Sequence, residues 1–143
     1  MSELYNRQIL RLAADIPRLG SLNRVDGTAE RRSPLCGSKL SVEVVFDGRI
    51  TDYAQQVKAC ALGQASASLF ARHVVGKGRD ELIDAASQME AFLKGGRVPA
   101  GDWQAFEIFT PAVEHTSRHG SIMLPFQATL DAIEAAEAKV SPA

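Results

Sequence analysis

Two cysteines are the residues of this chain with the most distinctive chemistry. Cys36 lies in the sequence Ser-Pro-Leu-Cys-Gly, which favours a loop, and Cys60 lies where a predicted strand gives way to a predicted helix. The positive end of a helix stabilises a thiolate, the form of cysteine that binds soft metals or accepts sulfur. Two thiols in a chain of this length can also be buried core residues. The pair is not a C-x-x-C motif, so spacing alone leaves a functional and a structural pair open.

A predicted β-hairpin separates the two cysteines. Apolar residues at alternate positions of 40–46 predict a strand with one face toward a core. Asp47-Gly48 predicts a two-residue turn with both residues at positive φ, and residues 49–58 form the return strand. This register places Phe46 opposite Arg49.

The same register places position 36 opposite position 59, so Cys36 and Cys60 are expected at the same end of the hairpin. That proximity is compatible with shared ligation of a metal. It also suits a reversible disulfide, which needs Cα atoms about 4.4–6.8 Å apart, or a persulfide carried by Cys60.

The remaining elements predict an α+β fold, with a small antiparallel sheet of about three strands and helices packed on one face. The 143 residues suit a single domain covering 1–143. An aromatic stripe of Trp103, Phe106 and Phe109 is expected in the core. Helical periodicity, caps and turn residues predict an edge strand at 28–33 and helices at 3–15, 61–75, 80–94, around 103–106, and from 121 or 123 to 139.

Composition excludes several classes of function. A formal charge of -1 and a pI near 6.3 argue against a nucleic-acid partner. No apolar run approaches the roughly 20 residues that span a bilayer, so we expect no membrane association and a cytoplasmic location. The sequence contains no recognisable catalytic constellation, which predicts that the protein is not an enzyme.

Three segments resemble the U-type iron–sulfur cluster assembly scaffolds, the IscU/SufU/NifU N-terminal family. Residues 33–37 (S-P-L-C-G) are similar to the ligand loop N-P-x-C-G-D of that family. Residues 60–68 (C-A-L-G-Q-A-S-A-S) are similar to its G-C-x-x-S-x-A-S-A-S stretch, where a ligating Cys opens a helix. Residues 118–126 (R-H-G-S-I-M-L-P-F) resemble R-x-x-C-A-x-L-x-W. The long interval between the second and third segments resembles the SufU branch.

This resemblance implies a SufE/IscU-like fold and a scaffold that binds iron or an iron–sulfur cluster through Cys36 and Cys60. It implies a cysteine desulfurase and other iron–sulfur assembly proteins as partners, and it allows a homodimer. The Asp of the family corresponds to Ser38, and its third Cys corresponds to Ser121, which is expected to face the cofactor; a shift of one residue would place that Cys on Gly120. A [2Fe–2S] centre ordinarily has four ligands, mostly thiolates, and a serine hydroxyl is a hard and weak substitute.

His119 is a nitrogen donor beside this third segment. Zinc accepts two Cys, one His and a water, so Cys36, Cys60 and His119 form a second candidate metal set. The alternative for His119 is an exposed position between a loop and a helix. The missing ligands could also come from a partner protein, a small thiol or a second subunit. A metal-free relative that docks onto a desulfurase or transfers sulfur is the rival hypothesis.

Overall fold

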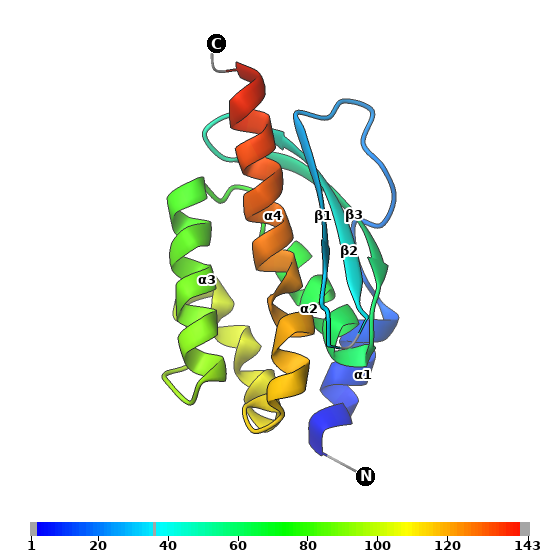
Figure 1. Ribbon diagram of the computed structural model, residues 1–143, viewed down its shortest axis with the longest axis vertical. Coiled ribbons are helices and arrows are strands. Elements are labelled where there is room, and N and C mark those ends of the chain that lie inside the picture. Colours follow the sequence, from blue (N-terminus) through cyan, green and yellow to red (C-terminus); the bar gives the residue numbers. More distant parts are fainter. Residues whose placement is uncertain (1–2, 36, 141–143) are drawn as a thin grey trace.

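A three-stranded antiparallel sheet with helices on one face organises the chain (Figure 1). The computed structural model describes residues 3–35 and 37–140, so Cys36 lies outside the described residues. The predicted α+β fold is confirmed. The elements are the 3-10 helices η1 (Glu3–Tyr5), η2 (Gly101–Ala112) and η3 (Thr116–Arg118), the strands β1 (Gly27–Arg32), β2 (Lys39–Phe46) and β3 (Ile50–Lys58), and the helices α1 (Arg7–Ala14), α2 (Ala61–Ala71), α3 (Arg79–Leu93) and α4 (His119–Val140).

The sheet has the order β1-β2-β3, so the predicted edge strand is present as β1. Leu40, Val42 and Val44 are buried, as their alternation in the sequence predicts. Helix α4 runs along β1 and β2 (Figure 1). Gly27 permits this close approach, because a Cβ atom there would lie 2.1 Å from the Ala132 carbonyl oxygen.

The predicted register of the hairpin is wrong. Phe46 pairs with Ile50 rather than with Arg49, and a bulge between Val45 and Phe46 shifts the rest of the ladder, which ends at Lys39 opposite Lys58. The Phe46 N–H donates to the Asp26 carboxylate (2.9 Å), and both backbone groups of Ile50 bond to residues 76 and 77. These competing partners prevent a two-residue turn, and only the glycine of Asp47-Gly48 has a positive φ.

The first helix and the helix predicted at 80–94 begin at other residues than predicted. The predicted helix 3–15 is divided at Asn6, whose side-chain oxygen accepts the Ile9 N–H (3.0 Å) and caps α1. The cap of α3 is Gly78 rather than Asp80, because Glu81 reaches back to accept the Gly78 N–H (3.1 Å). The hydrogen bond from the Gly78 N–H to the Glu81 carboxylate places a negative charge at the positive end of the helix, which favours this earlier start.

Helix α2 is shorter than predicted. It ends at Ala71, where the N–H groups of Arg72 and His73 bond to carbonyls three residues earlier instead of four. His73 therefore follows the helix, and its ring lies at 69° to that of Trp103 with centroids 6.1 Å apart. The last helix begins at His119, two residues before the first predicted start.

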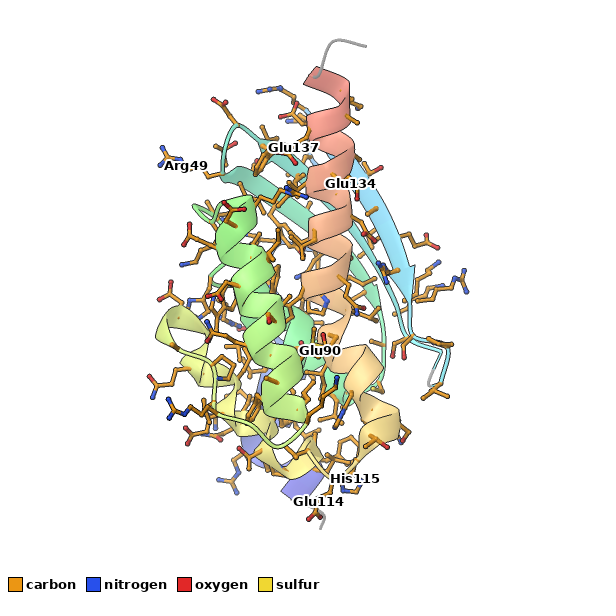
Figure 2. All side chains as sticks on the ribbon, turned by 60° about the vertical axis from the view of Figure 1, so that its left-hand side comes forward. Arg49, Glu90, Glu114, His115, Glu134 and Glu137 are labelled. Atoms are coloured by element: carbon orange, nitrogen blue, oxygen red, sulfur yellow. The ribbon has the colours of Figure 1, made fainter. Side chains whose placement is uncertain are left out.

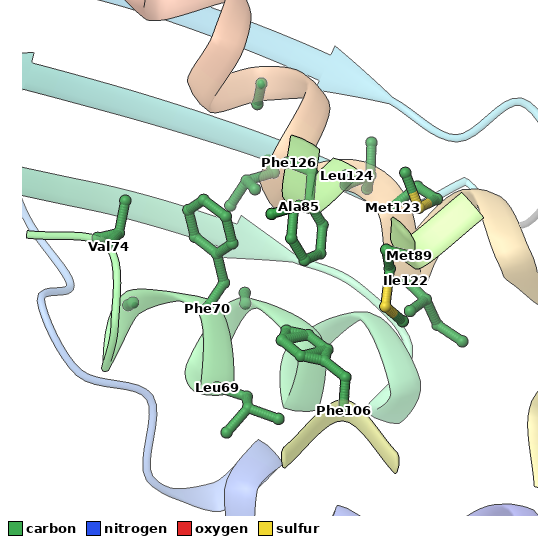
Figure 3. Close-up of a cluster of buried hydrophobic side chains, with 14 of the residues drawn as sticks. Leu69, Phe70, Val74, Ala85, Met89, Phe106, Ile122, Met123, Leu124 and Phe126 are labelled. Carbon is green, nitrogen blue, oxygen red and sulfur yellow. The ribbon is translucent and has the colours of Figure 1, made fainter. Parts of the chain in front are cut away.

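The predicted aromatic stripe is confirmed as core: Trp103, Phe106 and Phe109 are all buried. Phe126 of α4 packs against Phe70 of α2 and Phe106, with ring centroids 4.9 and 5.3 Å apart (Figure 3). Every residue of α2 from Leu62 to Ala71 except Gln64 is buried, so this helix lies inside the molecule and needs small side chains. Helix α2 contacts α1, α4 and β3.

Charged side chains lie on the outside of the molecule, as Figure 2 shows for Glu134 and Glu137 on α4 and Arg49 in the hairpin turn. Glu137 also joins α4 to α3 through an ion pair with Arg79 (3.4 Å). Within the described part of the chain, no helix has the length and hydropathy that a membrane crossing requires.

We predict that Tyr53 makes folding sensitive to alkaline pH. Burial raises the pKa of Tyr53 well above its usual value of 10, although the Thr129 hydroxyl donates to its oxygen (3.3 Å). The stabilisation is complete below pH 10 and declines above it, because only the unfolded state ionises there. Above pH 10 the free energy of unfolding should fall by about 1.4 kcal/mol per pH unit.

Urea unfolding between pH 9 and 11 tests this prediction. Tyr53→Phe should remove the slope and Tyr5→Phe should retain it; equal slopes would contradict the prediction.

Candidate functional site

Three segments that are distant in sequence meet at the end of the sheet opposite the β2–β3 turn (Figure 1). They are the connection from β1 to β2, the start of α2 and the start of α4. Cys60 is the N-cap residue of α2 and is a free, half-buried thiol. Its side chain makes no capping hydrogen bond. As the N-cap residue, Cys60 lies at the positive end of a buried helix. This is the position that the sequence predicts for a thiolate.

Ser38 and Ser121 join the other two segments to Cys60. The Ser121 hydroxyl donates to Ser38 Oγ at 2.8 Å, across 83 residues of sequence. Ser38 Oγ accepts the Cys60 N–H (3.4 Å), and the Ser38 hydroxyl donates to Cys60 Sγ (3.9 Å). The three side chains form a chain of hydrogen bonds that ends on the sulfur.

Glycines leave little free space around these hydroxyls. A Cβ atom on Gly63 would lie 2.8 Å from Ala59 Cβ, 3.4 Å from Ser121 Cβ and 3.6 Å from Ser38 Oγ. A Cβ atom on Gly120 would lie 2.7 Å from Ser33 Oγ. The backbones of α2, α4 and the loop before β2 therefore approach one another closely around the two serines.

A hydrogen bond between α2 and α4 keeps the start of α4 in place. Ser66 Oγ, which is fully buried, donates to the Ile122 carbonyl at 2.6 Å. Pro125 follows one turn after Ser121 and lacks the N–H that would bond to the Ser121 carbonyl. The weakened helical ladder at this turn is thus supported from α2, which holds Ser121 against Ser38.

The structure places His119 against a different group. Its Nε2 lies 2.8 Å from the Ala112 carbonyl oxygen and 3.1 Å from that of Val113. Both oxygens are acceptors, so Nε2 carries a proton and donates to the end of η2. A metal ion would have to use Nδ1. His115 is exposed at the end of the molecule near Glu114 (Figure 2).

Among the described residues, no three His, Cys, Asp or Glu side chains gather as a metal site. Cys36, the other predicted thiol ligand, lies outside the described residues. An open groove of about 610 Å³ is lined by residues that include Leu4, Phe92 and His115, but not by Cys60. Among the described residues, Cys60, Ser38 and Ser121 therefore meet outside this groove.

Sequence reasoning missed Ser38 as a site residue and treated it only as the replacement of the family Asp. Its contacts with both Cys60 and Ser121 make it the central residue of the arrangement. Its position two residues after Cys36 was the available signal.

A family profile and a known protein both match part of this chain. The sequence profile of the NifU-like N-terminal domain matches residues 4–106. The iron–sulfur cluster assembly scaffold protein IscU of Streptococcus pyogenes serotype M1 is 30% identical over 82 residues, which are 57% of this chain. The chain spans about half the length of that relative, 51%.

Solved structures extend the similarity to almost the whole chain. The N-terminal NifU-like protein of Brucella abortus is 41% identical with a TM-score of 0.91, covering 97% of this chain and 98% of its own. A putative iron–sulfur cluster assembly scaffold protein for the SUF system from Fervidobacterium islandicum AW-1 is 19% identical with a TM-score of 0.83, covering 91% and 96%. The latter likeness concerns the fold alone.

Proposed function

The chain belongs to the NifU-like N-terminal domain family, a family of iron–sulfur cluster assembly scaffolds, and from this premise we propose that it carries a soft metal cargo on Cys36 and Cys60. The cargo is iron, an iron–sulfur cluster or zinc. The chain would act as one domain, residues 1–143, in the cytoplasm and without an enzymatic reaction of its own.

The observation that carries this proposal is the position of Cys60. Its sulfur lies at the N-terminus of a buried helix, half-buried, and receives a hydroxyl hydrogen bond from Ser38. A helix N-terminus and a hydroxyl donor are both groups that interact favourably with a metal-bound, negatively charged sulfur. Cys36 precedes Ser38 by two residues in the sequence and is the proposed second ligand.

Two thiolates do not complete the coordination of a cluster or of zinc. We propose that the remaining ligands come from His119 through Nδ1, a small thiol, a second subunit or a partner protein. A cysteine desulfurase and other iron–sulfur assembly proteins are the partners that the family suggests. Such a site would release its cargo more readily than a closed one.

Metal and acid-labile sulfide analysis of protein purified without air tests the proposal. We expect bound iron with sulfide, or zinc, in the wild-type protein, and a fall to the level of the buffer in both Cys36→Ser and Cys60→Ser. The matched control is Ser41→Ala, whose hydroxyl donates to Glu30 (3.4 Å) and which should keep its metal. Equal metal content in the wild type and both cysteine variants would refute cargo binding by these thiols.

A metal-free docking or sulfur-transfer relative is the second candidate. It is favoured by the hydrogen bonds among Ser38, Ser121 and Cys60, which satisfy these groups without any ion. Wild-type protein without metal that still binds a cysteine desulfurase would select this second function. Wild-type protein that neither contains metal nor binds a cysteine desulfurase would contradict both proposed functions.

A further inference from the structure

We infer that Ser38 and Ser121 are positioning residues, which orient the Cys60 sulfur toward its cargo from outside the coordination sphere. This inference rests on the proposed role of Cys60 as a ligand. It departs from the sequence-based expectation that Ser121 itself faces the cofactor. The two serines occupy the places of an Asp and a Cys ligand in the family motif, yet their contacts suit a different task.

The two serines are more deeply buried than Cys60. Ser38 is 1% exposed and Ser121 is 0% exposed, whereas Cys60 is half-buried. Gly63 approaches both serines so closely that even a methyl group there would touch them. Cys60 is thus the most accessible of the three residues, and the two serines lie in packed protein.

The Ser38 hydroxyl group takes part in several hydrogen bonds within the protein. Ser38 Oγ accepts one bond from the Ser121 hydroxyl and one from the Cys60 N–H, which uses both of its lone pairs. Its own hydroxyl can donate to Cys60 Sγ, which lies 3.9 Å away. The oxygen already accepts hydrogen bonds from the protein, which disfavours direct ligation of a metal ion, and its hydroxyl can donate to a charged sulfur.

The separation of 3.9 Å between Ser38 Oγ and Cys60 Sγ is long for a neutral pair. A ligating sulfur is negatively charged, and donors move closer to charged acceptors and bind them about twice as strongly. The contact is consequently expected to strengthen when cargo is bound. An alcohol oxygen as a direct ligand would be a hard donor with a tightly held proton, which soft metals disfavour.

Ser121 is a hydrogen-bond donor to Ser38. By donating to Ser38 Oγ, it favours donation by the Ser38 hydroxyl to the Cys60 sulfur. Ser121 itself is held by the next residue, Ile122, whose carbonyl binds Ser66 of α2. The two serines thus join α4 and the loop before β2 to the Cys60 sulfur. Residues that orient metal ligands in this way typically affect metal affinity by 10- to 100-fold.

Anaerobic titration of the reduced, full chain with Co²⁺ tests this inference. Thiolate-to-cobalt absorption reports bound sulfur, and ligand-field absorption reports the coordination geometry. We expect Ser38→Ala to lower the affinity for Co²⁺ by about 10- to 100-fold, with unchanged bands at saturation. Ser121→Ala should give a smaller loss with the same bands. Ser41→Ala should bind like the wild type, and thermal unfolding should verify that all variants fold.

The possible results separate this inference from the proposed function. Wild-type affinity in folded Ser38→Ala, or changed ligand-field bands in either serine variant, would overturn the positioning role while leaving cargo binding intact. Absence of a thiolate-to-cobalt band in the wild-type protein would overturn the proposed function and this inference with it. Weaker binding with unchanged bands supports both.

Discussion

The double variant Ser38→Asp/Ser121→Cys is expected to bind Zn²⁺ at least about 100-fold more tightly than the wild-type protein. The change supplies a carboxylate and a thiolate at the two places where the family motif has them. Ser38 Oγ lies 2.8 Å from Ser121 Oγ and 3.9 Å from Cys60 Sγ. Donors in a tetrahedral zinc site are about 3.3–3.8 Å apart, so larger side chains at both positions reach a suitable geometry after small adjustments.

The same variant should be less stable than the wild type when metal is removed. Position 38 is 1% exposed, and a carboxylate buried beside two sulfur atoms loses hydration and experiences repulsion. Saturating zinc should reverse the loss, because a ligand present at 100 times its Kd adds about 2.7 kcal/mol to the free energy of unfolding. Thermal unfolding with EDTA and with zinc measures both effects.

A competition titration with a chromophoric chelator measures the gain in affinity. The matched control is Ser38→Asn/Ser121→Ala, which changes the same positions without adding a negative charge or a thiolate and should bind no better than the wild type. If the Asp/Cys variant also bound zinc with wild-type affinity, positions 38 and 121 would not converge with Cys60 as the distances indicate.

Gly27→Ala is expected to destabilise the protein by about 3 kcal/mol. The added Cβ would lie 2.1 Å from the Ala132 carbonyl oxygen and 2.7 Å from the Ala136 amide nitrogen. Both atoms belong to the backbone of α4, so no side-chain rotation can relieve the overlap. Strand β1 or helix α4 must move, and the packing of the helix on the sheet is lost locally.

Urea and thermal unfolding measure this effect, with an expected fall of about 10 °C in the midpoint. Thr28→Ser changes the exposed neighbouring residue in the same strand and should alter stability by less than about 0.5 kcal/mol. A Gly27→Ala protein as stable as that control would mean that β1 and α4 are not in close contact in solution.

The elements of the fold could be predicted from the sequence where one local pattern dominates. Alternation in 40–46 predicted the buried face of β2, and helical periodicity after Cys60 predicted α2. The hairpin register could not be predicted, because Asp26 and the loop at 76–77 take backbone groups that the turn would have used. Such competition arises between segments that only folding brings together.

The sequence by itself determined which groups are available for chemistry. It contains two thiols, and it replaces an expected Asp and an expected Cys by Ser38 and Ser121. It also determined the family, since residues 4–106 match its profile.

Only the tertiary structure decided how these groups are used. It directs His119 Nε2 to the end of η2, and it links Ser121 to Ser38 and Ser38 to the sulfur of Cys60. The physical reason is that each hydrogen bond depends on distance and direction between side chains of separate segments. Residue type and spacing state what a side chain can donate or accept, whereas the packing of α2, α4 and the sheet determines which partner it meets.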